Sequence, residues 1–187
     1  MVDARIRRTD AILRATILAL AGSAPVSHIS VSELTRAAGI NRATFYSHYI
    51  SPQDLLGAVL RDDLDDLRAA DLRRRAEVGG TDAESNRATI QEVVDHIRRY
   101  EAIYRLALVD NTDKTTHHAL AAHFDQSVHY IFAQLPDGSM PDVDHQIMAG
   151  YLSNGLVGAI ESWLARPDLS EEQLIATIEE ATPQWMR

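Results

Sequence analysis

Apolar residues recur at helical spacing along nearly the whole chain of 187 residues, and no segment shows the alternation of a half-buried strand. The first apolar stripe has spacings of seven, four and three and comprises Ile6, Leu13, Ile17 and Leu20. Later stripes fall within residues 55–67, 90–97, 103–108, 120–132, 143–164 and 174–178. This periodicity predicts an all-α protein of about nine helices, in which three small N-terminal helices precede a larger helical bundle.

Residues that begin and end helices occur where these stripes begin and end. The runs SVSE at 30–33 and SEEQ at 170–173 both have the form of a capping box. Gly39 can take the left-handed conformation that a helix C-terminus often needs, and Asn41 can cap the next, short helix. Ser51, followed by proline, predicts the start of a long helix that ends at about Arg75.

The composition excludes several classes of protein. There is no cysteine, so disulfides, thiol catalysis and cysteine-ligated zinc are excluded. No apolar run approaches the roughly 20 residues that span a bilayer, and the N-terminus lacks the apolar core of a signal peptide. We therefore expect a cytoplasmic protein. The glycine pair in Val78 to Ser85 predicts a long flexible loop there.

The charge is unevenly distributed along the chain. The net charge is −9, but residues 1–50 carry six arginines against three acidic residues, which leaves +3 there and −12 in the remainder. A basic head on an acidic body favours two parts with different partners, although six arginines in fifty residues can also arise by chance.

The run AAGINRATFYSHY at 37–49 indicates what the basic part of the chain binds. Helical spacing places Phe45 and Tyr49 on one inward face, while polar side chains occupy the other side. Two helices joined by a tight glycine turn, the second with an exposed polar start, predict a helix-turn-helix whose second helix enters the major groove of DNA. Arginine can pair with guanine and the threonine methyl can contact thymine, whereas contacts to phosphate set register rather than sequence.

The run SVSELTRAAGINRATFYSHY at 30–49 resembles the DNA-binding domain of the TetR family of bacterial transcriptional regulators. The resemblance extends through Leu55 and Leu56 and covers roughly residues 5–60. It implies an all-helical homodimer, a helix-turn-helix DNA-binding domain at 1–50, and a ligand-binding and dimerisation domain at 51–187.

Carried over by position, the resemblance also implies the residues that contact DNA. Those that approach bases are Arg42, Ala43, Thr44 and Tyr46. Those that hold phosphates or flanking bases are Ser47 and His48, with Val31 or Ser32 at the start of the second helix. The chain departs from the family at Pro52, where a phosphate-binding lysine is usual. Either that contact is missing, or the N-terminus of the fourth helix replaces it.

Three glycines lie within one predicted helix, at Gly150, Gly155 and Gly158. Each interior glycine costs about 1 kcal/mol relative to alanine, so close approach of another helix is the expected reason. The pattern that includes Gly155, Gly158, Trp163 and Leu164 resembles a subgroup of TetR C-terminal domains, and the family dimerises through its last two helices. We therefore predict that these glycines lie at a dimer interface; packing within the chain is the alternative.

The resemblance also implies an effector pocket among the middle helices, for which no cofactor or metal is predicted. Seven polar or aromatic residues lie on apolar or mixed faces there and are candidate ligand contacts: His96, Tyr100, Tyr104, His123, Phe124, Met148 and Tyr151. Ordinary core packing is the alternative for each of them, and a regulator that has no effector is the alternative for the pocket.

Two other functions are alternatives to a transcriptional regulator. His117, His118, His123, Asp125 and His129 suggest a metalloenzyme, but adjacent histidines diverge on a helix and a catalytic zinc typically has three protein ligands. The sequence contains no nucleophile motif, phosphate loop or dinucleotide fingerprint. A helical interaction protein that has lost DNA binding stays open because of Pro52. We predict a ligand-responsive repressor, not an enzyme, that binds double-stranded palindromic operator DNA as a homodimer, with a small-molecule effector and no membrane association.

Overall fold

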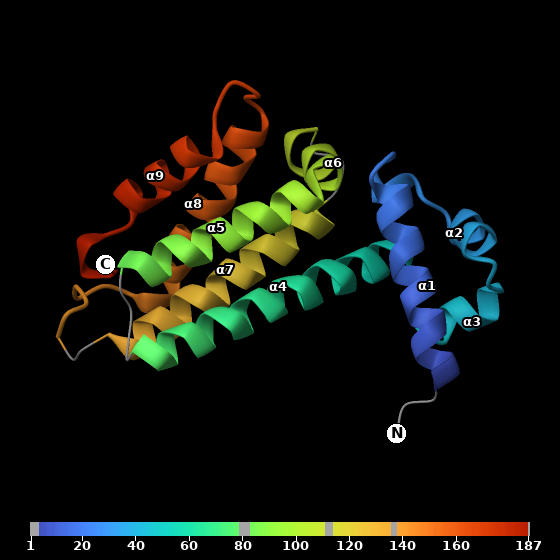
Figure 1. The fold of residues 1–187 in the computed structure, drawn as a ribbon, viewed down its shortest axis with the longest axis horizontal. Coiled ribbons are helices and arrows are strands. Elements are labelled where there is room, and N and C mark those ends of the chain that lie inside the picture. Colours follow the sequence, from blue (N-terminus) through green and yellow to red (C-terminus); the bar gives the residue numbers. More distant parts are fainter. Residues whose placement is uncertain (1–3, 79–82, 111–113, 136–137, 187) are drawn as a thin grey trace. The chain divides into compact units, whose positions relative to one another are not determined.

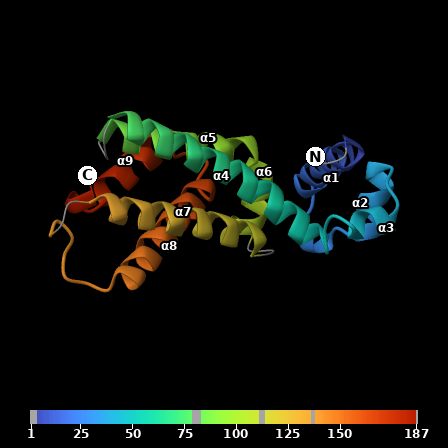
Figure 2. The same cartoon turned by 90° about the horizontal axis from the view of Figure 1, so that it is seen from below.

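The computed structural model describes residues 4–78, 83–110, 114–135 and 138–186, and all its regular elements within these ranges are helical (Figures 1 and 2). The α-helices are α1 (Ala4–Ala21), α2 (Val31–Ala38), α3 (Arg42–Tyr46), α4 (Pro52–Val78), α5 (Ala83–Arg99), α6 (Glu101–Tyr104), α7 (Thr115–Gln134), α8 (His145–Leu164) and α9 (Glu171–Ala181). Short 3-10 turns are η1 (Val26–His28) and η3 (Gln184–Met186), and η2 (Arg105–Val109) is a π-helical turn. The all-α prediction, with nine α-helices in the described part of the chain, is confirmed.

Two helix boundaries differ from the sequence-based prediction. The helix α4 ends at Val78 rather than at about Arg75. The predicted loop at Val78 to Ser85 is shortened from both sides, because α4 includes Val78 and α5 begins at Ala83. The glycine pair between them lies outside the described residues.

The chain divides into two compact units. Unit 1 comprises Met1–Asp62 and Tyr100–His117, and unit 2 comprises Asp63–Arg99 and His118–Arg187. Unit 1 therefore contains α1, α2, α3, the start of α4, α6 and η2. The rest of α4 forms unit 2 with α5, most of α7, α8 and α9. The functional boundary after residue 50 remains a prediction.

The core of unit 1 is built on the predicted stripe of α1, with one exception. Leu13 and Ile17 are fully buried, and Leu20 is half-buried. Ile6, however, is 48% exposed, because it lies about two turns before Leu13, near the start of α1. The stripe was therefore one residue too long at its N-terminal end.

Unit 2 is held together by apolar packing and by ion pairs between helices. Val128 and Phe132 of α7 pack with Ala149 of α8 in one buried cluster. Arg87 of α5 reaches two carboxylates of α9, which are Glu172 at 2.7 Å and Glu179 at 2.8 Å. These contacts place α7 against α8, and α5 against α9. None of the described helices is both long and apolar enough to cross a membrane.

Candidate functional site

Local hydrogen bonds fix the geometry of α2, the turn and α3. The Oγ of Ser30 accepts from the Glu33 N–H at 3.1 Å, which forms one half of the predicted capping box. Gly39 ends α2 with φ 66°, a left-handed conformation that disfavours residues with a Cβ. The Oδ1 of Asn41 then accepts from the Thr44 N–H at 2.8 Å. The backbone thus turns within a few residues, and α3 begins directly after it.

The inward face of α3 anchors the helix in unit 1. Phe45 is fully buried and Tyr49 is 9% exposed, as the helical spacing predicts. The hydroxyl of Tyr49 donates a hydrogen bond to Asp10 of α1. Burial, and then this bond to a carboxylate, raise the pKa of Tyr49 to about 12, so the hydroxyl stays protonated at neutral pH. The segment directly after α3, in which Tyr49 lies, is therefore tied to α1.

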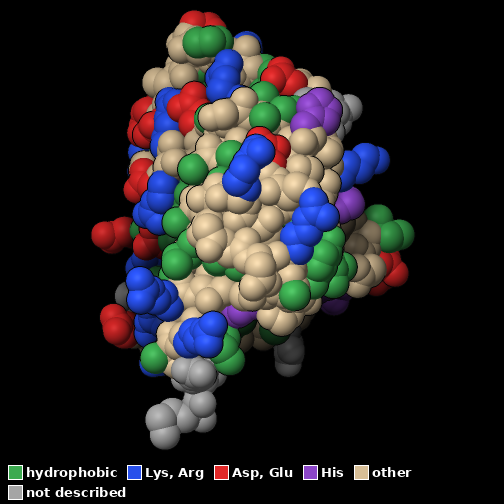
Figure 3. All heavy atoms as spheres, turned by 90° about the vertical axis from the view of Figure 1, so that its right-hand side faces the viewer, with side chains coloured by type: hydrophobic (Ala, Val, Ile, Leu, Met, Phe, Trp, Pro, Cys, Tyr) green, Lys and Arg blue, Asp and Glu red, His purple; other side chains and the backbone are tan. Residues whose placement is uncertain are grey.

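The outward face of α3 presents most of the residues predicted to approach bases. Arg42, Ala43 and Tyr46 are exposed, with Tyr46 at 57%, and Thr44 is half-buried. The Arg42 guanidinium donates to the Oγ of Ser32 on α2, so the structure joins two predicted DNA contacts. Lys and Arg side chains are spread over the surface seen in Figure 3, which looks onto unit 1. The outward face is therefore rich in hydrogen-bond donors.

The predicted phosphate contacts flank this face. Ser32 and Ser47 are exposed, while Val31 and His48 are half-buried. The hydroxyl of Ser47 donates to the Thr44 carbonyl at 2.7 Å, which leaves the oxygen of Ser47 as an acceptor rather than a donor to phosphate. The ring of His48 stacks on Tyr49, with centroids 6.3 Å apart.

The N-terminus of α4 is occupied by its own side chains. The Asp54 N–H donates to the Oγ of Ser51 at 3.0 Å, and the Asp54 carboxylate accepts from the Ile50 N–H at 3.1 Å. Pro52 is buried at the first helical position. A carboxylate here repels phosphate, so this helix end is a poor substitute for the lysine that is usual in the family.

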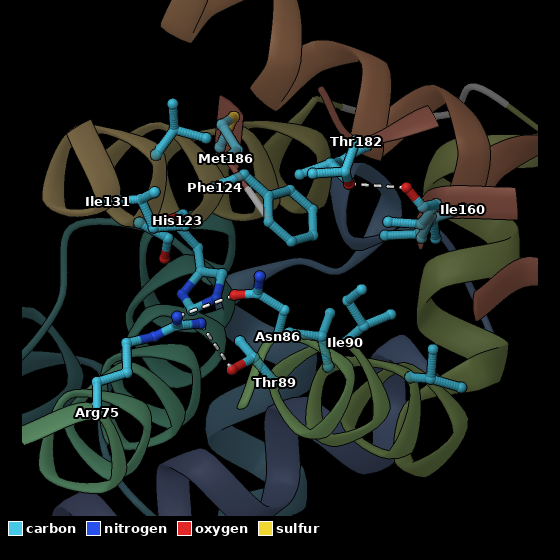
Figure 4. Close-up of a pocket in the computed structure, with 16 residues that line it drawn as sticks. Arg75, Asn86, Thr89, Ile90, His123, Phe124, Ile131, Ile160, Thr182 and Met186 are labelled. Carbon is cyan, nitrogen blue, oxygen red and sulfur yellow. Dashed lines mark hydrogen bonds between the residues drawn. The ribbon is translucent and has the colours of Figure 1, made fainter. Parts of the chain in front are cut away.

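Unit 2 encloses a cavity of about 120 Å³ (Figure 4). Its apolar lining comes from α5, α7, α8, α9 and η3 and consists of Ile90, Val93, Val94, Phe124, Val128, Ile131, Leu156, Ile160, Ile178 and Met186. Its polar lining consists of Arg75, Asn86, Thr89, His123, Ser127 and Thr182. A mostly apolar cavity with a few polar groups is typical of a small-molecule site.

The Arg75 guanidinium lies at one end of this cavity and is almost fully paired. Its Nε donates to Asp71 at 2.7 Å, and its two terminal nitrogens donate to Asn86 at 2.9 Å and to Thr89 at 3.3 Å. Arg75 is 3% exposed and Asp71 is 6% exposed. The polar end is thus a buried, hydrogen-bonded ion pair, and Figure 4 shows Asn86 and Thr89 turned toward the arginine.

His123 is the other buried polar group of the lining. It is 4% exposed, and its Nδ1 has no hydrogen-bond partner among the described residues. Burial, reinforced by the charge of Arg68, lowers the pKa of His123 to about 4, so the imidazole is neutral at neutral pH. Which of the two ring nitrogens of His123 carries the proton therefore depends on the group that forms a hydrogen bond with the ring.

The seven predicted ligand contacts do not gather in this cavity. His123 and Phe124 line it, whereas Met148 packs on the cluster around Val128. His96 lies elsewhere in unit 2, in a hollow shared with three acidic residues. Tyr100 and Tyr104 belong to unit 1, and Tyr151 is 73% exposed.

Sequence reasoning missed the polar end of the cavity. Asp71 and Arg75 are four residues apart on α4, a spacing that allows a pair on one helix face. That spacing is enough to predict the ion pair from the sequence. Burial of the pair could not be predicted from spacing, because it requires α5 to lie against α4. Arg74 of α4 pairs there with Glu92 of α5 at 2.8 Å.

The three glycines of α8 are not explained by packing within the chain. A Cβ added at Gly150, Gly155 or Gly158 would meet no described atom within 4 Å. Gly155 and Gly158 are exposed, and Gly150 is half-buried. The alternative of close intrachain packing therefore fails for all three.

The histidine and acidic residues considered for a metal site do not cluster. Among the described residues, no group of three or more such side chains could hold a metal ion. The predicted pair at spacing four is present, with His129 Nε2 at 3.8 Å from Asp125.

Two buried histidines predict a loss of stability in acid. The pKa values of His96 and His123 are lowered by burial from 6.5 to about 4, so the unfolded chain binds protons that the folded chain does not. The free energy of unfolding should therefore fall between pH 6.5 and 4, by up to about 1.4 kcal/mol per pH unit for each histidine. Urea unfolding across this range measures the slope. His123→Phe should reduce it, whereas an unchanged slope would contradict the assignment to His123.

Comparison with known proteins gives a match to a family model and a partial match to one sequence. The family model TetR_C_8, "Transcriptional regulator C-terminal region", matches residues 85–183. The uncharacterized HTH-type transcriptional regulator YxbF of Bacillus subtilis (strain 168) is 36% identical over 61 residues, which are 32% of this chain and 16% of that protein. The aligned part is thus a small fraction of that relative's length.

Two solved structures share the fold at low sequence identity. A putative TetR-family transcriptional regulator from Syntrophomonas wolfei superposes with a TM-score of 0.69 at 12% identity, covering 93% of this chain and 92% of the other. The fatty acid degradation regulator FadR from Bacillus halodurans superposes with a TM-score of 0.67 at 10% identity, covering 92% and 93%. With the family model covering more than half of the sequence, the chain belongs to the TetR family of transcriptional regulators.

Proposed function

We propose that this protein is a ligand-responsive repressor that binds a palindromic operator as a homodimer in the cytoplasm. Residues 1–50 bind DNA in this proposal, and residues 51–187 bind the effector and form the dimer. The observation that carries the proposal is α3, whose Phe45 side is buried while its Arg42 and Tyr46 side is exposed. A short helix held by caps and one buried face, with its donors outward, suits entry into a major groove.

The individual contacts in this proposal divide into two kinds. Arg42, Ala43, Thr44 and Tyr46 read bases, and Val31, Ser32 and His48 hold phosphates or flanking bases. Ser47, whose hydroxyl proton is used by the Thr44 carbonyl, accepts from a flanking base. The Arg42–Ser32 bond holds the guanidinium beside α2 before DNA arrives. Arginine has five N–H donors, so it can keep this bond while it meets a guanine edge.

The charge distribution supports weak non-specific binding. The +3 of residues 1–50 attracts phosphate, whereas the −12 of the remainder repels it. Specific base contacts must therefore supply a large share of the affinity, and binding should fall with salt in proportion to the number of phosphates that the protein contacts.

A gel shift with genomic fragments tests the proposal against the interaction-protein alternative. A DNA-binding regulator should retard one or a few fragments and ignore the others at physiological salt. A protein that retards none of the fragments has lost DNA binding, and the proposal would then be wrong.

The proposed dimer interface predicts opposite outcomes at Gly155. An added side chain has room in the isolated subunit, so substitution should raise helix stability by about 1 kcal/mol if nothing packs there. If a partner helix packs there, Gly155→Leu should overfill the contact, at a cost of about 1–3 kcal/mol in each subunit. We expect the second outcome, seen as dissociation or aggregation by light scattering. A monomeric wild-type protein, or a stabilised dimeric variant, would contradict it.

The proposed effector site predicts a reciprocal effect on DNA binding. A small ligand in the unit 2 cavity should loosen operator binding, and operator DNA must then weaken that ligand by the same factor, often about 5- to 150-fold. Titration of an identified ligand with and without operator measures this factor. A ligand that releases DNA, but whose own affinity is the same with and without operator DNA, would contradict the proposal that the two sites are coupled.

A further inference from the structure

We propose that the cavity in unit 2 binds a small uncharged molecule with a single hydroxyl or carbonyl head group on a compact apolar body, and that the His123 imidazole binds the head group. This inference rests on the proposed function, in which the cavity is the effector site, and adds the chemistry of the ligand. Three features of the lining support it: a fully buried imidazole nitrogen without a partner among the described residues, positive and negative charges that offset each other, and an otherwise mostly apolar wall.

The Nδ1 of His123 is a fully buried polar atom of the lining that has no partner among the described residues. The hydroxyl of Ser127 donates to the His123 carbonyl at 2.9 Å, that of Thr182 to the Ile178 carbonyl at 2.8 Å, and that of Thr89 to Asp71. Of the buried side-chain atoms without a partner in the described residues, only Nδ1 of His123 belongs to a residue of this lining. Because such an atom is costly to leave unpaired, a ligand atom that meets it gains affinity.

The charges at the polar end of the cavity cancel. Asp71 pairs with Arg75 at 2.7 Å and with Arg74 at 3.1 Å. Arg74 also pairs with Glu92 at 2.8 Å, which gives two arginines and two carboxylates in one network. Arg68, whose charge acts on His123, is paired in turn with Asp65. An ionised ligand carboxylate would enter this buried site without an uncompensated positive charge to offset its desolvation, so the site disfavours anions.

A neutral imidazole suits an uncharged head group. One ring nitrogen carries a proton and the other accepts a hydrogen bond, and a hydroxyl can serve either nitrogen. A carbonyl can accept from the protonated one. The choice between the two tautomers therefore does not change the class of ligand that fits.

The remaining lining selects the body of the ligand. Ten of the sixteen lining residues are apolar, and the cavity of about 120 Å³ has room for only a small molecule. The ring of Phe124 stands edge-on to His123, with centroids 5.5 Å apart, so the apolar wall begins directly beside the head-group contact. Burial of apolar ligand atoms there is favourable, and the polar end fixes the orientation.

Matched pairs of small molecules test the inference on the full chain. Hexan-1-ol and cyclohexanol are titrated at neutral pH against hexanoate and cyclohexanecarboxylate, with affinity from calorimetry and the His123 ring nitrogens followed by NMR. We expect each alcohol to bind about 10-fold or more tightly than its carboxylate, because only the carboxylate brings an uncompensated charge. The alcohols should shift the His123 nitrogen signals while the ring stays neutral.

Two variants on α7 locate the head-group contact. His123→Phe removes the hydrogen bond and keeps a ring, so it should weaken the alcohols by about 3- to 10-fold and leave the carboxylates unchanged. His129→Phe is the matched control, because His129 lies on the same helix but outside the cavity lining. It should bind like wild type. The nitrogen signals of the wild-type protein provide the test even if His123→Phe does not fold.

Three results would overturn the inference: tighter binding of the carboxylates, no binding of either alcohol, or alcohol binding that leaves the His123 signals unmoved. A gel shift on the same samples keeps this result separate from the proposed function. If the alcohols do not bind but the protein still binds DNA, only the proposed class of ligand is wrong. If the alcohols bind but the protein does not bind DNA, the ligand site is supported and the proposed repressor function is wrong.

Discussion

Replacing Arg42 by alanine should weaken binding to the operator by about 2–6 kcal/mol, or roughly 30- to 20,000-fold, because a dimer loses two base contacts of about 1–3 kcal/mol each. The variant should also tolerate any base at one symmetric position of the site. The structure makes this a clean substitution, since Arg42 is exposed and its hydrogen bond is to the exposed Ser32. Fluorescence anisotropy with the operator and with single-position variants measures both effects.

His48→Ala and Arg36→Ala are the controls for this substitution. His48 is proposed to hold phosphate, so its loss should weaken binding to operator and scrambled DNA alike. Arg36 is exposed on α2, and its replacement removes the same charge without a proposed base contact. If Arg42→Ala behaves like Arg36→Ala on every sequence, Arg42 does not read a base.

Replacing Asp71 by alanine should lower the free energy of unfolding by about 3–5 kcal/mol, because it leaves the buried Arg75 without its carboxylate. Asp71 also accepts hydrogen bonds from Arg74 and Thr89, so the loss reaches both α4 and α5. Urea unfolding at a fixed protein concentration measures the difference, since a dimer's apparent stability depends on concentration.

Asp65→Ala is the matched control on the same helix. Asp65 pairs with Arg68, whose side chain is 18% exposed, but the Asp65 side chain itself is 56% exposed, so water can replace the lost carboxylate and the loss should be well below that for Asp71. Equal losses for the two variants would show that the Asp71–Arg75 pair is not the buried anchor that its exposure indicates.

The helical order could be predicted because its signals are local. Asn41 caps α3 from its own side chain, and Ser170 and Gln173 form both bonds of a capping box at α9. Such hydrogen bonds depend only on residues three positions apart, so sequence spacing suffices to predict them. The inward and outward sides of α3 followed from periodicity in the same way.

The cavity could not be predicted, because it depends on how several helices face one another. Tyr151 and Phe124 both lie in apolar stretches, yet Tyr151 is 73% exposed and Phe124 lines the cavity. Periodicity identifies an apolar face, but it does not tell whether that face meets a core, a cavity or a partner chain. Tyr151 is exposed and lies four residues before Gly155 on α8, as expected of a helix face that contacts a partner chain. The sequence pattern alone could not distinguish such a face from one in the core.

Footprinting the wild-type protein on DNA upstream of its own and neighbouring genes tests most directly whether α3 reads an operator as part of a two-fold dimer. A repressor of this kind should protect a palindrome or near-palindrome whose half-sites lie about 34–36 Å apart, or a multiple of that spacing, on one face of the duplex. Protection should disappear with Arg42→Ala at concentrations where the wild-type protein saturates the site. Protection without two-fold symmetry, or protection that survives both Arg42→Ala and His48→Ala, would contradict DNA reading by this helix.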